Sequence, residues 1–202
     1  MFPALKSIGL EDDEIRRAWA AMRYGSWQTK ELLDTWRTYV MGQGEWQASQ
    51  YAGYYTKAVD ITAYRRPTLK GLESKHYHDE ADKALPAVVF GMVGRVGRVA
   101  GQRMALLTDL VRVDLKDPSK TACQTKLLQQ VAENLAVDEM PVLDAGFKLQ
   151  ALRKAGLKRF VVRLATNFTA RRNFLPEYEG GRPAEYGDIV RPLARTYGGK
   201  PI

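Results

Sequence analysis

The sequence predicts an α/β protein in which an N-terminal helical pair precedes a mixed sheet of three antiparallel strands and then parallel strands with helices. Three observations predict this class. Apolar residues recur at the helical period over residues 10–40, the pattern becomes strand-like at residue 54, and helix and strand patterns alternate after residue 117. With 202 residues, 45% of them apolar, the chain can form one core with a helical appendage. We expect the helical region at residues 1–48 and the α/β core at residues 49–202.

Two amphipathic helices are predicted near the N-terminus. The first covers residues 10–24, where Ile15, Trp19 and Met22 recur at spacings of four and three. The second covers residues 29–40, and its apolar stripe contains Leu32, Leu33, Trp36 and Val40. Because two of the tryptophans fall on these stripes, all four are interpreted as core residues: Trp19, Trp27, Trp36 and Trp46. Residues 42–53 read as a loop.

Three strands are expected next. Residues 54–64 are rich in β-forming residues, and residues 86–96 and 103–113 form two further strands joined by a Gly-rich turn. The glycines between residues 91 and 101 do not match G-x-G-x-x-G or a phosphate-binding loop, so a hairpin explains them better than a nucleotide site.

The remaining elements alternate. Asp117 and Pro118 supply a cap and a first-turn proline for a helix that runs to about Ala136, with Leu128, Val131 and Leu135 as its buried positions. An apolar strand over residues 140–143 ends in Asp144. A short helix closed by Gly156 and a strand over residues 159–164 follow.

Two aspartates are the candidate functional residues. Asp60 is the one acid within an otherwise apolar strand, where an unpaired carboxylate is costly unless it binds a cation or a proton. Asp144 ends a buried strand, and ligands of α/β sheets collect outside the carboxyl ends of strands. The alternative for Asp144 is a structural role as the cap of the following helix.

The order of the elements brings these aspartates together. Three antiparallel strands followed by a crossover to a parallel strand describe the ribonuclease H-like arrangement, in which the first and fourth strands are neighbours. Asp60 and Asp144, 84 residues apart in sequence, would then lie side by side. Two close carboxylates repel one another unless a cation lies between them, and Mg²⁺ (or Mn²⁺) prefers such oxygen ligands. Two such ions about 4 Å apart can support phosphodiester cleavage.

The distribution of charge points to a polyanion. Residues 145–202 hold 12 Lys and Arg against 4 Asp and Glu, whereas the other 144 residues hold 19 of each. All of the net charge of +8 therefore lies in the C-terminal part, a pattern that favours nucleic-acid binding over the alternative of a solvated basic face.

The rest of the composition is consistent with a cytoplasmic protein. The single cysteine, Cys123, has no internal disulfide partner and is interpreted as a buried filler in a helix. No apolar run is long enough for a membrane helix. His76 and His78 have a two-residue spacing without a third ligand, so we expect no zinc site.

Four sequence blocks also carry a resemblance. Residues 58–67 (AVDITAYRRP) resemble the first-aspartate block of DDE-type transposases from bacterial insertion sequences, and residues 142–147 (VLDAGF) resemble their second-aspartate block. Residues 159–167 (RFVVRLATN) and 181–183 (GRP) are similar to the strand and the Gly-Arg-Pro element that follow in that family. The similarity begins at about residue 50 and spans most of the remaining chain.

The resemblance implies DNA cleavage and strand transfer at transposon ends by two-metal chemistry. Asp60 would bridge two metal ions and Asp144 would hold one. DNA is the implied partner, and a homodimer is compatible with the family. Six arginines are candidate phosphate contacts: Arg65, Arg66, Arg163, Arg171, Arg172 and Arg182.

One departure from the family concerns the third acid, a glutamate on a later helix. No segment matches the Tyr, Arg, Glu and Lys spacing that marks that helix, and Glu177, Glu179 and Glu185 lie in a Pro/Gly-rich loop. We therefore expect a transposase fragment that is inactive alone. Two alternatives stay open: a non-catalytic nucleic-acid-binding protein with a basic C-terminal region, and a phosphotransfer or hydrolase enzyme built on a doubly wound parallel sheet with Asp60 as the nucleophile.

Overall fold

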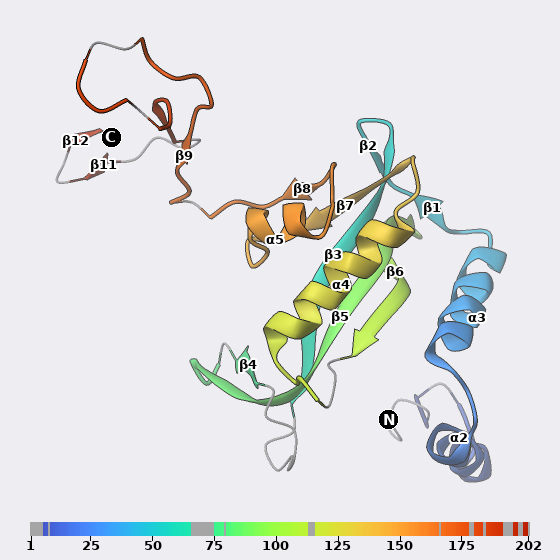
Figure 1. Ribbon diagram of the computed structural model, residues 1–202. Helices are drawn as coiled ribbons and strands as arrows, with labels where there is room; N and C mark the ends of the chain where they lie inside the picture. Colours follow the sequence, from blue (N-terminus) through green and yellow to red (C-terminus); the bar gives the residue numbers. More distant parts are fainter. Residues whose placement is uncertain are drawn as a thin grey trace.

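The computed structural model describes most of the chain. The described residues are 6–7, 9–65, 75–78, 80–112, 116–165, 167–177, 180–183, 185–191, 196–197 and 200–201. Within them the protein has an α/β architecture with a mixed sheet, which confirms the predicted class (Figure 1).

The main sheet has eight strands, and five of them form its body. In spatial order these are β6 (Gln102–Arg112), β5 (Lys83–Val99), β3 (Tyr54–Arg65), β7 (Glu139–Leu143) and β8 (Val161–Val162). The first three in the chain pair antiparallel, whereas β7 pairs parallel with β3 and β8 parallel with β7. The antiparallel pairing of β3 with β5 shows that the doubly wound parallel sheet was a wrong alternative.

Three short strands lie in segments where no strand was expected. β1 (Gln47–Ala48) pairs with β5, and β2 (Gln50–Tyr51) turns back onto the start of β3. β4 (Lys75–His78) pairs with the beginning of β5. These two-to-four-residue strands lack an apolar pattern of their own and depend on a long neighbouring strand for their hydrogen bonds.

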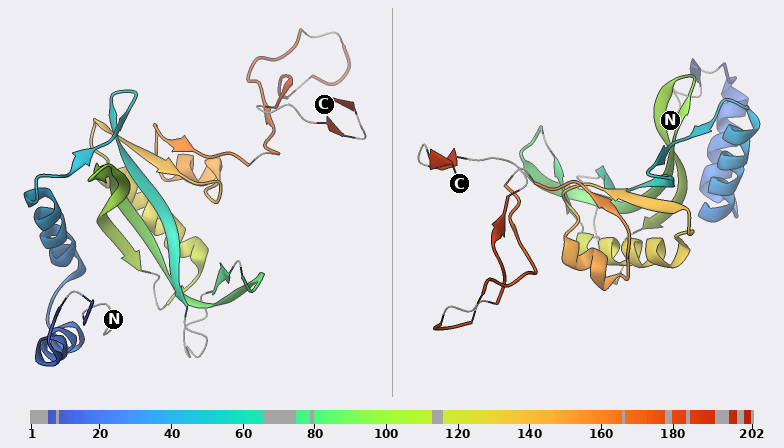
Figure 2. Two further views of the ribbon diagram at one scale, coloured as in Figure 1. Left: turned by 180° about the vertical axis from the view of Figure 1, so that it is seen from behind. Right: turned by 90° about the horizontal axis from the view of Figure 1, so that it is seen from above.

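One face of the sheet forms the core. α4 (Lys120–Asn134) crosses this face, and α5 (Leu149–Lys154) lies beside it on the same side of the sheet (Figure 2). Val59, Val89 and Val93 of the sheet pack with Leu127 and Leu128 of α4 in the buried cluster. Of the helix positions predicted to be buried, Leu128 and Val131 are confirmed, as is the filler role of Cys123, whereas Leu135 is half-buried and follows the end of α4 at Asn134. The opposite face is called the distal face below.

The helix α4 begins slightly later than the sequence suggests. Ser119 is its N-cap, and the Ser119 hydroxyl accepts a hydrogen bond from the Ala122 N–H at 3.0 Å. The Asp117 carboxylate instead accepts from the Ser119 N–H, so Asp117 and Pro118 precede the helix. The prediction that Asp117 caps this helix is therefore wrong, because Ser119, which is also a good capping residue, takes that position.

The glycines between residues 91 and 101 have two different roles. Only Gly101 belongs to the hairpin turn, where it and Ala100 both have positive φ, as the two-residue turn between Val99 and Gln102 requires. Gly91 and Gly97 allow close packing. An added Cβ would lie 2.8 Å from the Leu127 side chain at Gly91 and 2.4 Å from the Trp46 ring at Gly97. The hairpin interpretation is therefore right for the turn and incomplete for the strand.

The N-terminal helices are α2 (Asp12–Tyr24) and α3 (Thr29–Gly42), close to the predicted bounds. α3 packs beside β6 at the edge of the sheet, and α2 lies beyond it (Figure 1). Trp27 and Trp36 are 49% and 46% exposed, so their assignment to the core is wrong. Trp19 and Trp46 are half-buried.

The C-terminal arm, meaning the described residues from 167 onward, extends away from the sheet (Figure 1). It contains two separate two-stranded ladders, β9 (Ala170–Arg171) with β10 (Ile189–Val190) and β11 (Thr196–Tyr197) with β12 (Lys200–Pro201). No described strand of the arm joins the main sheet. Across the part of the chain that the structure describes, no helix combines the length and apolar character needed to cross a membrane.

Candidate metal and nucleic-acid site

The pairing of β3 with β7 brings the two candidate aspartates to one place. The parallel register aligns Ala58 with Val142 and Val59 with Leu143. Asp60 follows Val59 and Asp144 follows Leu143, so the two aspartates are the next pair in this register. Neighbouring strands in a sheet lie about 4.8 Å apart. The fold therefore positions Asp60 and Asp144, called the acid pair below, side by side at the carboxyl end of β7.

The acid pair lies on the distal face. Val59 and Leu143 are both buried in the core against α4, and successive side chains along a strand point to opposite faces. Asp60 and Asp144 follow these buried residues, and both are exposed. The two carboxylates are thus on the same side of the sheet and open to solvent, as a site for a hydrated cation requires.

Asp60 is not the buried carboxylate that the sequence predicts. The sequence suggested a carboxylate that burial in a central strand would penalise, but Asp60 is exposed. β7 ends opposite Val59, so within the described residues β3 has no paired strand on that side at Asp60 and beyond. The Asp60 carboxylate accepts a 2.7 Å hydrogen bond from the N–H of Ile61. Its position beside Asp144, rather than a burial cost, makes it a candidate ligand.

Asp144 occupies a tight turn instead of a helix cap. Its carboxylate accepts a 2.9 Å hydrogen bond from the Gly146 N–H, and the N-cap of α5 is Lys148. The alternative that Asp144 caps the following helix is therefore wrong. The turn is held from two sides. Phe147 is buried in the core, and the Gln124 side chain on α4 donates a 3.3 Å hydrogen bond to the Gly146 carbonyl.

Arg163 extends the acid pair along the sheet. The ladder between β7 and β8 aligns Leu143 with Val162 and continues with a 2.9 Å hydrogen bond from the Arg163 N–H to the Leu143 carbonyl. Arg163 therefore follows β8 as Asp144 follows β7. Its cation lies at the same end of the sheet as the two carboxylates and is exposed. Within the described residues, no ion pair joins it to a carboxylate.

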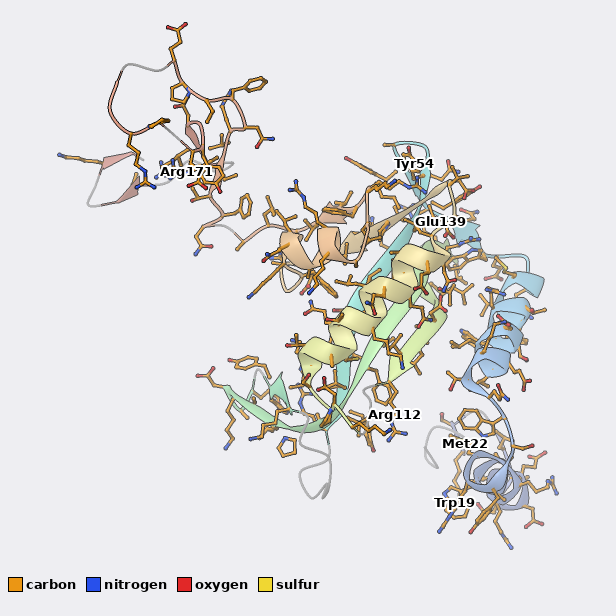
Figure 3. All side chains as sticks on the ribbon, in the orientation of Figure 1. Trp19, Met22, Tyr54, Arg112, Glu139 and Arg171 are labelled. Atoms are coloured by element: carbon orange, nitrogen blue, oxygen red, sulfur yellow. The ribbon has the colours of Figure 1, made fainter. Side chains whose placement is uncertain are left out.

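The other candidate arginines are not part of this cluster. Arg65 ends β3 and donates a 3.0 Å hydrogen bond to the Tyr77 carbonyl, which ties β3 to β4. Arg66 lies outside the described residues. Arg171, Arg172 and Arg182 are exposed on the C-terminal arm, and Figure 3 shows Arg171 away from the sheet. These three arginines therefore lie apart from the acid pair.

The acid pair offers two carboxylates. Among the residues that the structure describes, no group of three or more His, Cys, Asp or Glu side chains could hold a metal ion. Glu177 and Glu185 are exposed on the arm, and Glu179 lies outside the described residues. Two carboxylates with open positions can bind one hydrated Mg²⁺ or Mn²⁺, because Mg²⁺ keeps several of its waters.

A cluster of three charged residues, which the sequence did not reveal, lies toward the other end of the same strands. Glu139 is 4% exposed and bridges Lys57 at 2.7 Å and Arg95 at 2.9 Å; these three residues are called the Glu139 cluster. Figure 3 shows Glu139 near Tyr54, at the start of β3. The Glu139 carboxylate also accepts from the Ala136 N–H. The one signal in the sequence was a lone lysine inside the apolar pattern of β3.

The charge state of Glu139 follows from these contacts. Burial raises the pKa of Glu139, but hydrogen bonds from Lys57, Arg95 and the Ala136 N–H outweigh burial and lower the pKa below its ordinary value of 4.5. Glu139 is therefore an ionised and fully bonded group that fixes the start of β7. Its role is structural.

Comparisons of the chain with protein-family models, with curated proteins and with solved structures found no match.

Proposed function

We propose that the chain is a fragment of a DDE-type transposase, an enzyme of DNA cleavage and strand transfer with a ribonuclease H-like core, that its acid pair binds Mg²⁺ or Mn²⁺, and that it binds DNA. The observation that carries the proposal is the parallel register of β3 and β7, which puts Asp60 and Asp144 next to one another on one exposed face. The strand order β6, β5, β3, β7, β8 agrees with the arrangement expected for that core.

Electrostatics support a nucleic-acid substrate. A phosphate would meet the metal-bound acid pair on one side and the Arg163 guanidinium on the other, so that both attract its charge. Arg171, Arg172 and Arg182 lie on the C-terminal arm, where residues 167–202 hold 6 Lys and Arg against 4 Asp and Glu, a small positive excess. Contacts from such residues give affinity and orientation without reading the base sequence.

The acid pair alone does not complete a two-metal site. A bound divalent ion would polarise the scissile phosphate and lower the pKa of an attacking water. Holding two ions in position requires a further acidic ligand, and the described residues bring no third carboxylate to the pair. We therefore propose that this chain binds metal and DNA but does not catalyse strand transfer by itself.

Iron-directed cleavage tests this proposal. Fe²⁺ replaces Mg²⁺ at oxygen sites and, with ascorbate and peroxide, generates hydroxyl radicals that cut nearby polymer chains. We expect cuts in the protein backbone close to residues 60 and 144 and cuts in bound duplex DNA. Asp60→Asn and Asp144→Asn should both abolish these cuts, whereas the matched control Asp138→Asn, at an exposed acid outside the site, should retain them. Cleavage that persists in both acid-pair variants would place the metal elsewhere.

A non-catalytic nucleic-acid-binding protein is the second candidate. It is favoured by the local hydrogen bonds of the two carboxylates, to Ile61 and to Gly146, which give each aspartate a structural task. In that case duplex DNA binds to the wild-type chain and replacement of Arg171, Arg172 and Arg182 by alanine weakens binding, but divalent ions have no effect. Fluorescence anisotropy with and without Mg²⁺ separates the two functions, and the salt dependence of affinity should fall with each lost phosphate contact.

A further inference from the structure

A groove lies between the helices α4 and α5, on the side of the sheet opposite the distal face (Figure 2). The cavity within it has a volume of about 270 Å³. The buried side chain of Leu128 and the small side chains of Ala151 and Ala155 line its apolar part. Because alanines rather than larger residues occupy this side of α5, the two helices leave room between them for a ligand.

The charge of this groove is positive. Lys148 and Lys154, at the start and end of α5, line it, and both are exposed. Of the described residues that line the groove, none is an acid. Elsewhere in the described part of the chain, Lys6, Lys30 and Lys57 each form an ion pair with a carboxylate, whereas Lys148 and Lys154 form none. Their charges are therefore available to an anionic ligand.

The α4 side of the groove is polar and uncharged. Thr121 and Thr125 are one helical turn apart, and both line it. The Thr125 hydroxyl donates a 2.9 Å hydrogen bond to the Thr121 carbonyl, and the Thr121 side chain is exposed to solvent. A phosphate accepts hydrogen bonds at its oxygens, and lysine binds it as a point charge. The two lysines and the Thr121 hydroxyl are thus donors that a phosphate group can use.

The turn that carries Asp144 separates the groove from the acid pair. Gly146 lines the groove, its N–H donates to the Asp144 carboxylate, and its carbonyl accepts from the Gln124 side chain. Two residues of chain span at most about 7 Å. A DNA strand with one phosphate at the acid pair therefore has only this turn to cross before it meets the lysines of the groove.

We propose that the groove binds a sugar–phosphate unit of a single-stranded DNA extension that adjoins the phosphate at the acid pair. Its volume is close to the lower limit for small-ligand sites, so it has room for one phosphate with its sugar but not for a duplex. A single strand also bends over the Asp144 turn more easily than a duplex does. This inference rests on the proposed function and names the form of DNA that the acid pair takes.

Fluorescence anisotropy with two DNAs, a blunt duplex and the same duplex with a single-stranded extension, tests the proposal on the full chain in Mg²⁺. We expect the wild type to bind the extended duplex about tenfold more tightly. The double variant Lys148→Gln/Lys154→Gln should lose this preference, and its salt slope for the extended duplex should fall by about 1. Lys148 makes no side-chain cap bond to α5, so its replacement leaves the helix start intact. Lys126→Gln/Lys158→Gln removes the same charge at exposed lysines outside the groove and should keep the preference.

The outcomes separate this inference from the proposed function. A wild type that binds both DNAs equally, a groove variant that keeps the preference, or a control that loses it to the same extent would overturn the inference alone. A wild type that binds neither DNA would overturn the proposed function as well.

Site-specific cross-linking gives a readout that keeps both lysines. The native Cys123 is buried, so a cysteine introduced at exposed Thr125 is the one that takes a phenyl azide label. We expect labelled Thr125→Cys to cross-link to the single-stranded extension under light, and labelled Thr38→Cys, exposed on α3, not to do so. Equal cross-linking of the two variants would contradict the proposal. Excess thymidine monophosphate should not prevent the cross-link; if it does, the groove is a site for a free nucleotide and the proposal is wrong.

Discussion

The two ends of the β3–β7 strand pair both carry carboxylates, but in opposite conditions. At the start of β7, Glu139 is buried and bonded to Lys57, Arg95 and the Ala136 N–H. At the other end, Asp60 and Asp144 are exposed and adjacent, and among the described residues each carboxylate accepts a hydrogen bond from a backbone N–H of its own strand or turn. The same two strands thus supply one carboxylate that is paired with cations and two neighbouring exposed carboxylates, which we propose as a cation site.

The two ends of the strand pair therefore differ in what their carboxylates can bind. A buried carboxylate with two cations has no capacity left for a ligand, and its removal leaves two cations without a partner. An exposed pair contributes little to folding but provides a negative site. The predictions below compare the two ends, beginning with the largest expected effect.

Removal of the Glu139 carboxylate should destabilise the protein most. Glu139→Ala removes the ion-pair partner of Lys57, whose side chain is 11% exposed, and of Arg95, whose side chain is half-buried. We expect the free energy of unfolding, measured by urea denaturation, to fall by about 3 kcal/mol. Asp138→Ala changes the neighbouring exposed acid and is the control; it should stay within about 0.5 kcal/mol of the wild type. Equal losses in the two variants would mean that the Glu139 cluster does not stabilise the fold.

The contribution of Glu139 should also depend on pH. Because its pKa is lower in the folded than in the unfolded chain, its contribution is present above the ordinary value of 4.5 and is lost as the pH falls through the folded pKa. The stability difference between wild type and Glu139→Gln should therefore be constant near neutral pH and shrink below pH 4.5. Urea denaturation at about pH 7 and pH 3.5 measures it. A difference that grows in acid would contradict the sign.

The acid pair should matter much less to stability without metal. Asp60→Ala removes one of two neighbouring exposed charges together with the acceptor of the Ile61 N–H, and we expect these opposing effects to leave a change within about 0.5 kcal/mol. Asp144→Ala also removes the bond from the Gly146 N–H and should cost about 1 kcal/mol, whereas Asp144→Asn keeps an acceptor there. Thermal unfolding in the presence of a chelator compares the three. Losses as large as that of Glu139→Ala would give the acid pair a structural role.

The smallest effect is expected at Gln124. Its side chain holds the Asp144 turn through a 3.3 Å hydrogen bond to the Gly146 carbonyl. Gln124→Ala should lower stability by about 0.5 kcal/mol and weaken Mn²⁺ binding at the acid pair by a few fold. Gln129→Ala, an exposed glutamine on the same helix, is the control. Identical Mn²⁺ affinity in the two variants would show that the turn does not need Gln124.

Much of the sheet could be predicted because its long strands carry their own patterns. The sequence predicted the strands β3, β5 and β6 from their apolar runs, and also the hairpin after Val99 and the helix before β7. The order of these elements implied that β3 and β7 are neighbours. The sequence did not predict β1, β2 and β4, because these short strands form by pairing with β3 or β5 and have no strand pattern of their own.

Burial was harder to predict than strand order. The exposure of Asp60 depends on where β7 ends, and one or two residues at a strand end decide it. The apolar stripe predicted for α3 contained residues from two different faces of the helix. Val40 packs inward, whereas Leu32 and Trp36 point outward. The sequence shows the helical spacing but does not say which side meets the sheet. The Glu139 cluster joins residues from three strands, so no local sequence pattern predicts it.

Mn²⁺ binding, measured by the loss of the free-ion electron paramagnetic resonance signal, tests the central claim that the acid pair is a divalent-cation site. We expect the wild-type chain to bind Mn²⁺ in competition with Mg²⁺, Asp60→Asn and Asp144→Asn each to abolish binding, and Glu139→Gln to retain it. If the wild type binds no Mn²⁺, or if both acid-pair variants bind it as the wild type does, the acid pair is not a metal site.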